Sequence, residues 1–247
     1  MVTIRCGDST FPNIKAVVFD KDGTLADSRT FLRQLGQRRS RLIDAKIPGV
    51  DQPLLMAFGI EDNRLNPAGL MATGTRQESQ IAAAAYIAET GRGWAEAMAI
   101  AQSAFEEAEP ANERKALQTP IFEGAKELMK TLNAHSLKQG ILSSDITAHV
   151  IDFVQCYDLE SLVEVAMGTD LPPAKPDPTL LHHMSQKLEI NPESILVIGD
   201  SAVDIQMAHR AGVGGCIGVT WGWSNASDLA DAKAIAHQFS DIQVVHP

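Results

Sequence analysis

The chain has 247 residues, of which 45% are hydrophobic and 21% are charged, the composition of an ordinary folded domain rather than of a disordered or fibrous protein. Its net charge of −10 repels polyanions, so neither DNA nor RNA is an expected partner. No apolar run is long enough to cross a bilayer, and the first residues lack the continuous apolar core of a secretory signal. We therefore expect a cytoplasmic protein without a membrane partner. Three widely spaced cysteines without a C-x-x-C motif argue against a disulfide framework or a thiolate zinc site.

Five short apolar runs predict buried strands of a parallel sheet, in which both faces of each strand are covered. Helical periodicity follows most of them, and alternating strands and helices predict an α/β fold with a doubly wound, Rossmann-like and mostly parallel sheet. The predicted strands are residues 16–19, 140–142, 163–166, 195–198 and 215–219, and the predicted helices are residues 122–132, 146–153 and 202–211.

Two segments fall outside this alternation. Residues 3–6, followed by the turn-rich segment GDSTFPN, predict an antiparallel edge strand that leads into the first core strand. Residues 27–118 are rich in Ala and Glu and contain no convincing strand. They predict an all-helical cap domain, inserted into a loop at the end of the sheet where ligands bind. The core domain would then comprise residues 1–26 and 119–247.

Two aspartates follow the first predicted strand directly. Asp20 ends a run of four apolar residues, Asp22 comes two positions later, and Gly23 lets the chain turn. Two carboxylates about 4 Å apart repel by roughly 4 kcal/mol at an effective dielectric constant of about 20, so such a pair requires a cation, a shared proton or both. The alternative is a solvated loop in which Asp acts as a turn former.

A second pair of aspartates follows the predicted strand 195–198. Asp200 stands at the end of this strand, and Asp204 lies in the first turn of the next helix. Beside the pair at Asp20, Asp200 would complete a cluster of oxygen ligands suited to Mg²⁺. Ser201 and Asp204 have the spacing of a capping box, so Asp204 could instead stabilise the start of the helix.

The other two strand ends offer hydrogen-bond donors and positive charge. The segment ILSSD places the Ser143 hydroxyl and the following amides, including that of Ser144, at a junction between a loop and a helix, where phosphate oxygens bind well. A serine there is also an ordinary helix N-cap. Lys175 stands among four prolines in a loop that can be neither helix nor strand. Its alternative is a solvated loop cation.

In chain order, the segments FDKDGT, ILSS, AKPD and GDSAVD resemble the four motifs of the haloacid dehalogenase superfamily. The resemblance covers residues 15–26 and 119–220, and it implies a hydrolase of phosphoric monoesters with a C1-type helical cap. The segment GVTWGWSNASDL further resembles the phosphoglycolate-phosphatase-like branch. Lys21 replaces the usual apolar residue between the two aspartates, and Ser143-Ser144 replaces Thr-Asn. Both replacements are conservative for the mechanism.

The resemblance implies a role for each motif residue. Asp20 would be the nucleophile that forms an aspartyl-phosphate. Asp22 would protonate the leaving alkoxide and later deprotonate the hydrolytic water. Ser143, Ser144 and Lys175 would bind the phosphoryl oxygens.

The implied cofactor is Mg²⁺. Its ligands would be the Asp20 carboxylate, the Asp22 main-chain carbonyl and Asp200, with Asp204 acting through water. In phosphoryl transfer, the metal and the lysine neutralise charge and align the attack.

The cap would close over the site and supply contacts to a small phosphorylated metabolite. Residues 66–75, which contain Pro67, Gly69 and Gly74, predict a loop suited to this task. Arg76 at its edge could pair with a substrate carboxylate or a second phosphate. Ser28, together with the preceding aspartate, lies at the expected hinge, where a helix N-cap is an equally good interpretation.

Three functions remain open on the sequence. The leading one is a Mg²⁺-dependent phosphatase that acts on a small organic phosphate monoester. A sugar phosphomutase of the same superfamily would share Asp20 and Asp22 but transfer the phosphoryl group to a sugar. A catalytically silent phosphate-binding protein would keep the fold without turnover, and the intact set of motif residues argues against it.

Overall fold

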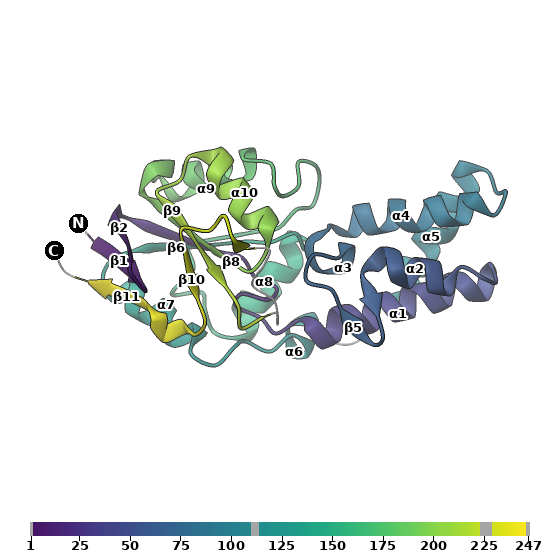
Figure 1. Ribbon diagram of the computed structural model, residues 1–247, viewed down its shortest axis with the longest axis horizontal. Helices are drawn as coiled ribbons and strands as arrows, with labels where there is room; N and C mark the ends of the chain where they lie inside the picture. The colour runs from purple at the N-terminus through teal and green to yellow at the C-terminus, as the bar shows by residue number, and fades with distance from the viewer. Residues whose placement is uncertain (1, 110–113, 223–228, 246–247) are drawn as a thin grey trace. The chain divides into compact units, whose positions relative to one another are not determined.

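The computed structural model describes residues 2–109, 114–222 and 229–245. The chain divides into two compact units, which are described separately below (Figure 1). The first unit combines Met1–Asp27 with Lys115–Pro247, and the second unit is Ser28–Arg114.

The main sheet of the first unit is parallel, in the strand order β10-β9-β8-β3-β6-β7. The α/β fold class expected from the alternating pattern is confirmed. Its central strand is the apolar run that comes first in the chain, and its neighbours come much later. The strands are β3 (Ala16–Phe19), β6 (Lys138–Leu142), β7 (Val165–Met167), β8 (Ile195–Gly199), β9 (Gly215–Val219) and β10 (Ala234–Ala236).

Helices cover both faces of this sheet (Figure 1). They are α7 (Ala125–Ala134), α8 (Thr147–Cys156), α9 (Thr179–Leu188) and α10 (Ala202–Ala211). Side chains alternate along β3, so that Val17 and Phe19 pack with α7 and α8, whereas Val18 packs with α9 and α10. Each fully buried apolar side chain of this kind stabilises the fold by about 1.5–3 kcal/mol. The unit also contains α6 (Lys115–Gln118) and the 3₁₀ turns η1 (Pro192–Ser194) and η3 (Phe239–Asp241).

A second, antiparallel sheet corrects one expectation. The predicted edge strand is β1 (Val2–Cys6), but it pairs with β2 (Ser9–Ile14) and β11 (Ile242–Val245) in a separate sheet. The segment expected to be turn-rich therefore contributes a strand. Phe11 and Ile14 of β2 are fully buried, and their apolar contacts outweigh the poor strand propensity of the residues between them.

The second unit is predominantly helical. Two expectations for it are wrong, because the unit also contains a short hairpin, and part of the predicted loop 66–75 is a helix. Asp62 and Asn63 close the hairpin with positive φ angles of 46° and 62°, which these residue types tolerate. The elements are α1 (Arg29–Lys46), α2 (Asp51–Phe58), β4 (Ile60–Glu61), β5 (Arg64–Leu65), α3 (Leu70–Thr73), α4 (Arg76–Glu89) and α5 (Trp94–Ala108).

Within the described ranges, the search for helices with the length and apolar character of a membrane span finds none. Part of the segment that resembles the phosphoglycolate-phosphatase-like branch, residues 223–228, lies outside the described residues.

The close approach of β7 to the loop before α8 predicts a sensitive position. A Cβ atom at Gly168 would lie 2.3 Å from the carbonyl oxygen of Asp145 and 2.4 Å from backbone atoms of Ile146 and Thr147. Because backbone cannot move aside as a side chain can, we expect Gly168→Ala to lower the free energy of unfolding by about 1–3 kcal/mol. Urea unfolding measures this change. Gly93→Ala is the control, since its Cβ atom would meet nothing within 4 Å, and equal stability of both variants would contradict the prediction.

Candidate active site

The site is built where β3 and β8 end side by side. Asp20 follows β3, and its backbone N–H donates to the carbonyl of Ile198 in β8 (2.9 Å). Asp200 follows β8 directly, and Thr24 Oγ1 donates to its Oδ1 (3.2 Å). The parallel register therefore brings these two aspartates to the same edge of the sheet, as the sequence predicted.

A buried lysine links this edge to α10. Lys175 Nζ donates to Asp20 Oδ1 (2.6 Å) and to Asp204 Oδ1 (2.7 Å). Lys175 is only 7% exposed, so the alternative of a solvated loop cation is wrong. The capping-box alternative for Asp204 is also wrong. Ser201 makes no side-chain cap bond, and its hydroxyl instead donates to Asp204 Oδ2.

Three of the carboxylates could hold a metal ion. Asp20, Asp200 and Asp204 are buried, and each offers one oxygen within 4.8 Å of the others. Asp20 Oδ2 is buried and makes no hydrogen bond with the residues described. A buried carboxylate oxygen without a donor is costly unless a cation accompanies it, and a compact group of carboxylate oxygens is what Mg²⁺ prefers. The residues present therefore fit this ion.

The electrostatics of the group point the same way. Burial raises the pKa of Asp20 to about 6, although Lys175 opposes this shift. Burial, together with the charges of Asp20 and Asp204, raises the pKa of Asp200 well above its ordinary value. The same two carboxylates raise the pKa of Lys175 despite its burial, so the lysine stays charged. One lysine does not neutralise three buried acids, and a divalent cation would remove the remaining repulsion.

Asp22 lies in a different electrostatic environment. The sequence predicted that its carboxylate would lie close to that of Asp20, and the charge of Asp22 does contribute to raising the pKa of Asp20. In the structure, Asp22 Oδ2 is 2.7 Å from Lys21 Nζ, and Asp22 Oδ1 is buried without a hydrogen-bond partner among the described residues. The Asp22 side chain is not a member of the three-carboxylate group.

Ser143 lies at the end of β6 and is 1% exposed. Its Oγ accepts a hydrogen bond from the backbone N–H of Asp145 (3.1 Å). Helix α8 begins at Thr147 with Ile146 as its N-cap, so the N-cap alternative for Ser143 is wrong. Ser143 instead shapes the loop after β6, which also contains Ser144.

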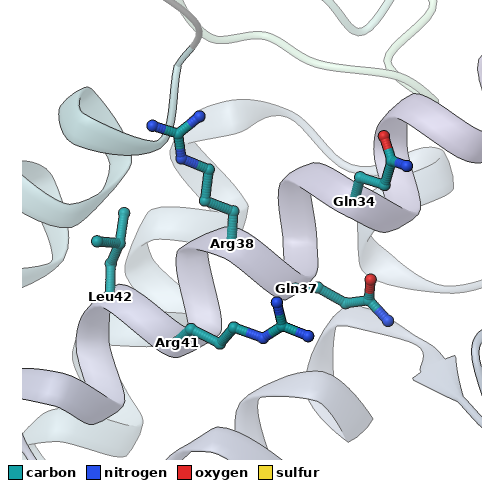
Figure 2. Close-up of a pocket in the computed structure, with 5 residues that line it drawn as sticks. All are labelled: Gln34, Gln37, Arg38, Arg41 and Leu42. Atoms are coloured by element: carbon teal, nitrogen blue, oxygen red, sulfur yellow. The ribbon is translucent and has the colours of Figure 1, made fainter.

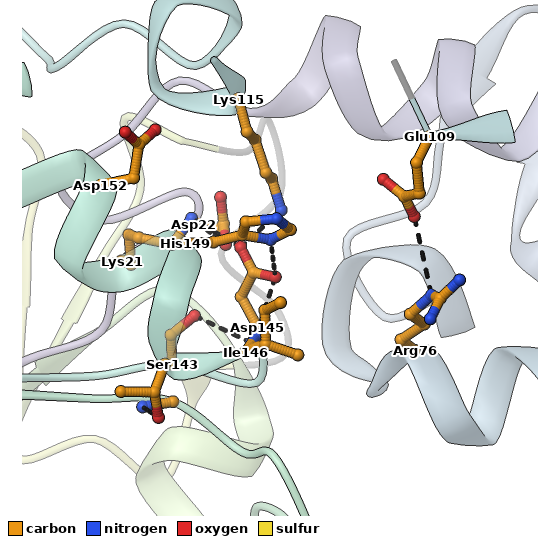
Figure 3. A network of polar contacts seen from close by, with 12 residues as sticks. Lys21, Asp22, Arg76, Glu109, Lys115, Ser143, Asp145, Ile146, His149 and Asp152 are labelled. Atoms are coloured by element: carbon orange, nitrogen blue, oxygen red, sulfur yellow. Dashed lines mark hydrogen bonds and ion pairs between the residues drawn. The ribbon is translucent and has the colours of Figure 1, made fainter. Parts of the chain in front are cut away.

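Sequence reasoning missed a charged cluster beside this loop. Lys21 Nζ lies 3.3 Å from Asp145 Oδ2, which also accepts from Lys115 Nζ (2.5 Å), and Asp145 Oδ1 pairs with His149 Nδ1 (2.8 Å) (Figure 3). The sequence held one signal for it. Lys21 is a charged residue at the end of a buried strand, where an apolar residue is usual, and it is 1% exposed.

The second unit contains the other predicted residues. Arg76 is the first residue of α4 and is half-exposed, and its Nε lies 3.7 Å from Glu109 Oε1, which also accepts from Arg39 Nη2 (2.9 Å) (Figure 3). Arg76 therefore forms an ion pair with an acidic residue of its own unit. Ser28 occupies the N-cap position of α1 but makes no side-chain cap bond.

A pocket of about 460 Å³ lies along α1 (Figure 2). Its lining is polar apart from one leucine, and Arg38 Nη2 donates to the carbonyl of Glu107 (3.1 Å). None of the aspartates of the first unit described above lines it. The lining residues are Gln34, Gln37, Arg38, Arg41 and Leu42.

Comparisons with known proteins show the family of the chain. The family model for haloacid dehalogenase-like hydrolases matches residues 14–212. A phosphoglycolate phosphatase from Mannheimia succiniciproducens is 30% identical over 125 residues, which span 49% of this chain and about half (55%) of that protein. A phosphoglycolate phosphatase from Salmonella choleraesuis is 26% identical, over 93% of this chain and 91% of its own length. The expected resemblance to the phosphoglycolate-phosphatase-like branch is confirmed.

Solved structures show the same fold. A predicted phosphoglycolate phosphatase from Haemophilus somnus superposes with a TM-score of 0.70 at 21% identity, covering 93% of this chain and 96% of that chain. A structure from Thermotoga maritima described as a β-phosphoglucomutase gives a TM-score of 0.60 at 19% identity, covering 90% and 94%.

The excess of buried negative charge predicts an unusual effect of removing one acid. A carboxyl whose pKa is raised in the folded protein holds its proton more tightly there than in the unfolded chain. For Asp20, the free energy of unfolding therefore falls as the pH rises from 3.8 to about 6. Asp200, shifted in the same direction, adds to this loss of stability at neutral pH.

We therefore expect Asp200→Asn to raise the melting temperature of the metal-free protein at neutral pH by about 2–8 °C. The asparagine Oδ1 can still accept from Thr24. The variant should also lose the stabilisation that Mg²⁺ gives the unaltered chain. Calorimetry with and without Mg²⁺ measures both effects, with the exposed Asp158→Asn as control. A lower melting temperature without metal would show that Asp200 stabilises the fold by itself.

Proposed function

Because the chain belongs to the haloacid dehalogenase-like hydrolase family, we propose that it is a Mg²⁺-dependent phosphatase that hydrolyses a small organic phosphate monoester. The observation that carries this proposal is the buried group of Asp20, Asp200 and Asp204 with Lys175 bound between two of them. It supplies a nucleophilic carboxylate, a cation site and a fixed positive charge at one edge of the sheet.

Asp20 is the proposed nucleophile. One oxygen of its carboxylate is bound to Lys175, and the other, Oδ2, is buried and has no hydrogen-bond donor in the part of the chain that the structure describes. A carboxylate oxygen attacks phosphorus, and the bond from phosphorus to the alkoxide breaks as the aspartyl-phosphate forms. Water then attacks the phosphorus, which releases inorganic phosphate and restores the Asp20 carboxylate.

Asp22 is the proposed acid and base. It gives a proton to the leaving alkoxide in the first step and takes one from the attacking water in the second, so its proton is restored in each cycle. Ser143, Ser144 and Lys175 are the proposed donors to the phosphoryl oxygens. Lys175 keeps its charge in the buried site, as this task requires.

The proposed ligands of Mg²⁺ are the Asp20 carboxylate, the Asp22 main-chain carbonyl and Asp200, with Asp204 acting through water. The fit of Asp20, Asp200 and Asp204 to a cation supports this assignment. Bound Mg²⁺ would neutralise the charge that accumulates on the phosphoryl group.

The proposed substrate is a small phosphorylated metabolite similar to phosphoglycolate. Its support is the similarity to phosphoglycolate phosphatases over most of the chain. We propose that the second unit serves as the cap over the site. We propose that Arg76 pairs with a second anionic group of the substrate. Arg76 would then give up its contact with Glu109.

The proposal is tested by measuring the release of inorganic phosphate from phosphoglycolate, sugar phosphates and nucleoside monophosphates, with and without Mg²⁺. We expect turnover only with the metal. Asp20→Asn should lower kcat at least about 10³-fold because it removes the nucleophile. The exposed Asp158→Asn, which removes a carboxylate from the same unit, should keep full activity.

Two other results would replace this proposal with the alternatives. Isomerisation of a hexose phosphate without phosphate release would indicate a phosphomutase. Binding of phosphate esters without turnover of any of them, with Mg²⁺ present, would indicate a silent binding protein.

A further inference from the structure

The buried ammonium group of Lys21 lies between two carboxylates. Its Nζ is 2.7 Å from Asp22 Oδ2 and 3.3 Å from Asp145 Oδ2. It also lies 5.9 Å from the centre of the Phe153 ring, a favourable position for a cation. Lys21 therefore joins the turn after β3, which contains Asp22, to the loop after β6, which contains Ser143 and Asp145.

Asp145 is a fixed anchor for this lysine. Besides the two lysines, its carboxylate accepts from the backbone N–H of Ile146 (2.9 Å) and pairs with His149 Nδ1 (2.8 Å). The lysines and His149 hold the pKa of Asp145 well below its ordinary value despite burial. A carboxylate held from several sides has little freedom to move, so it fixes the position of the Lys21 Nζ.

Lys21 is charged in this position. Burial alone would lower its pKa, but the charges of Asp22 and Asp145 raise it above the ordinary value. The ammonium group therefore has charge-assisted contacts with both carboxylates. Lys21 contacts both aspartates of the cluster, and Lys115 contacts Asp145.

We propose that Lys21 is a positioning residue for Asp22: its Nζ holds Asp22 Oδ2 against the Asp145 anchor and leaves Asp22 Oδ1 as the oxygen that exchanges protons with the leaving group and the water. This division of the carboxylate into a bound and an available oxygen is supported by Oδ1, which is buried and has no hydrogen-bond partner within the described ranges. The inference rests on the proposed function, because it assigns Asp22 as acid and base. It adds Lys21 and Asp145 to the residues on which that step depends.

A comparison of two substrates tests this role. An aliphatic alkoxide is a strong base and needs a proton as it leaves, whereas para-nitrophenolate is a stable anion that leaves without one. Lys21→Met keeps an unbranched side chain but removes the donor. We therefore expect it to lower kcat/KM, which reports the formation of the aspartyl-phosphate, about 10–100-fold more for the alkyl ester phosphoglycolate than for para-nitrophenyl phosphate. The later hydrolysis step is common to both esters and does not enter this comparison.

A double-mutant cycle separates positioning from general damage. Asp22→Asn should show the same selective loss of kcat/KM for the alkyl ester, and adding Lys21→Met to Asp22→Asn should lower kcat/KM no further. Lys126→Met is the matched control, since Lys126 binds the carbonyl of Tyr157 (2.7 Å) away from the cluster. It should leave the ratio of the two kcat/KM values unchanged.

A second variant keeps the role of Lys21 testable if Lys21→Met does not fold. Lys21→Met leaves two buried carboxylates with one contact fewer, so Lys21→Met/Asp145→Asn, which removes one charge of each sign, is measured beside it. Whichever of these two variants folds should show the same selective loss for the alkyl ester. Equal losses of kcat/KM for both esters, or a full further loss in the Asp22→Asn background, would falsify the positioning role alone. Absence of phosphate release from both esters by the unaltered chain with Mg²⁺ would overturn the proposed function together with this inference.

Discussion

The contact of one buried ammonium group with two buried carboxylates is the constraint on which the site depends. Lys175 comes from a proline-rich loop, Asp20 from the end of β3 and Asp204 from the first turn of α10. Removing each ion from water costs several kcal/mol, and close contacts must offset that cost. At 2.6 Å and 2.7 Å, the three segments have little freedom to shift. The pairing of β3 with β8 and the start of α10 are thus parts of the same electrostatic arrangement.

The sequence predicted this edge of the sheet well because its signals are local. Four apolar residues before Asp20, and four followed by Gly199 before Asp200, mark buried strands. Parallel strands bring the residues that follow them to a common edge of the sheet. Both ends of helix α10 were predicted correctly. Gly212 marks its C-terminal end because this glycine adopts a left-handed conformation. The resemblance to haloacid dehalogenase-like hydrolases rests on the order of the four motifs, and it predicted that their residues belong to one site.

Other features could not be predicted from the sequence because they depend on distant partners. The strand β2 carries Pro12 and Asn13, and it forms because Phe11 and Ile14 are buried and because β1 pairs with it. Ser201 has the spacing of a capping box, yet Lys175 from another loop shares Asp204. The same holds for Lys21, whose partner Asp145 lies beyond the entire second unit in the chain. Pairing across such distances leaves no periodic pattern in the sequence.

The order of strands also has a consequence for how the chain reaches its native state. The central strand β3 lies between β6 and β8, and β1 pairs with β11, which is among the last residues described. The first unit therefore depends on non-local contacts, which form slowly because a long loop must close first. The second unit is continuous in sequence, so its helices pack together without waiting for residues that come later in the chain. During synthesis on the ribosome, the second unit can fold early. The strand β3 stays unpaired until its partners have been synthesised, and an unpaired apolar strand is vulnerable to aggregation.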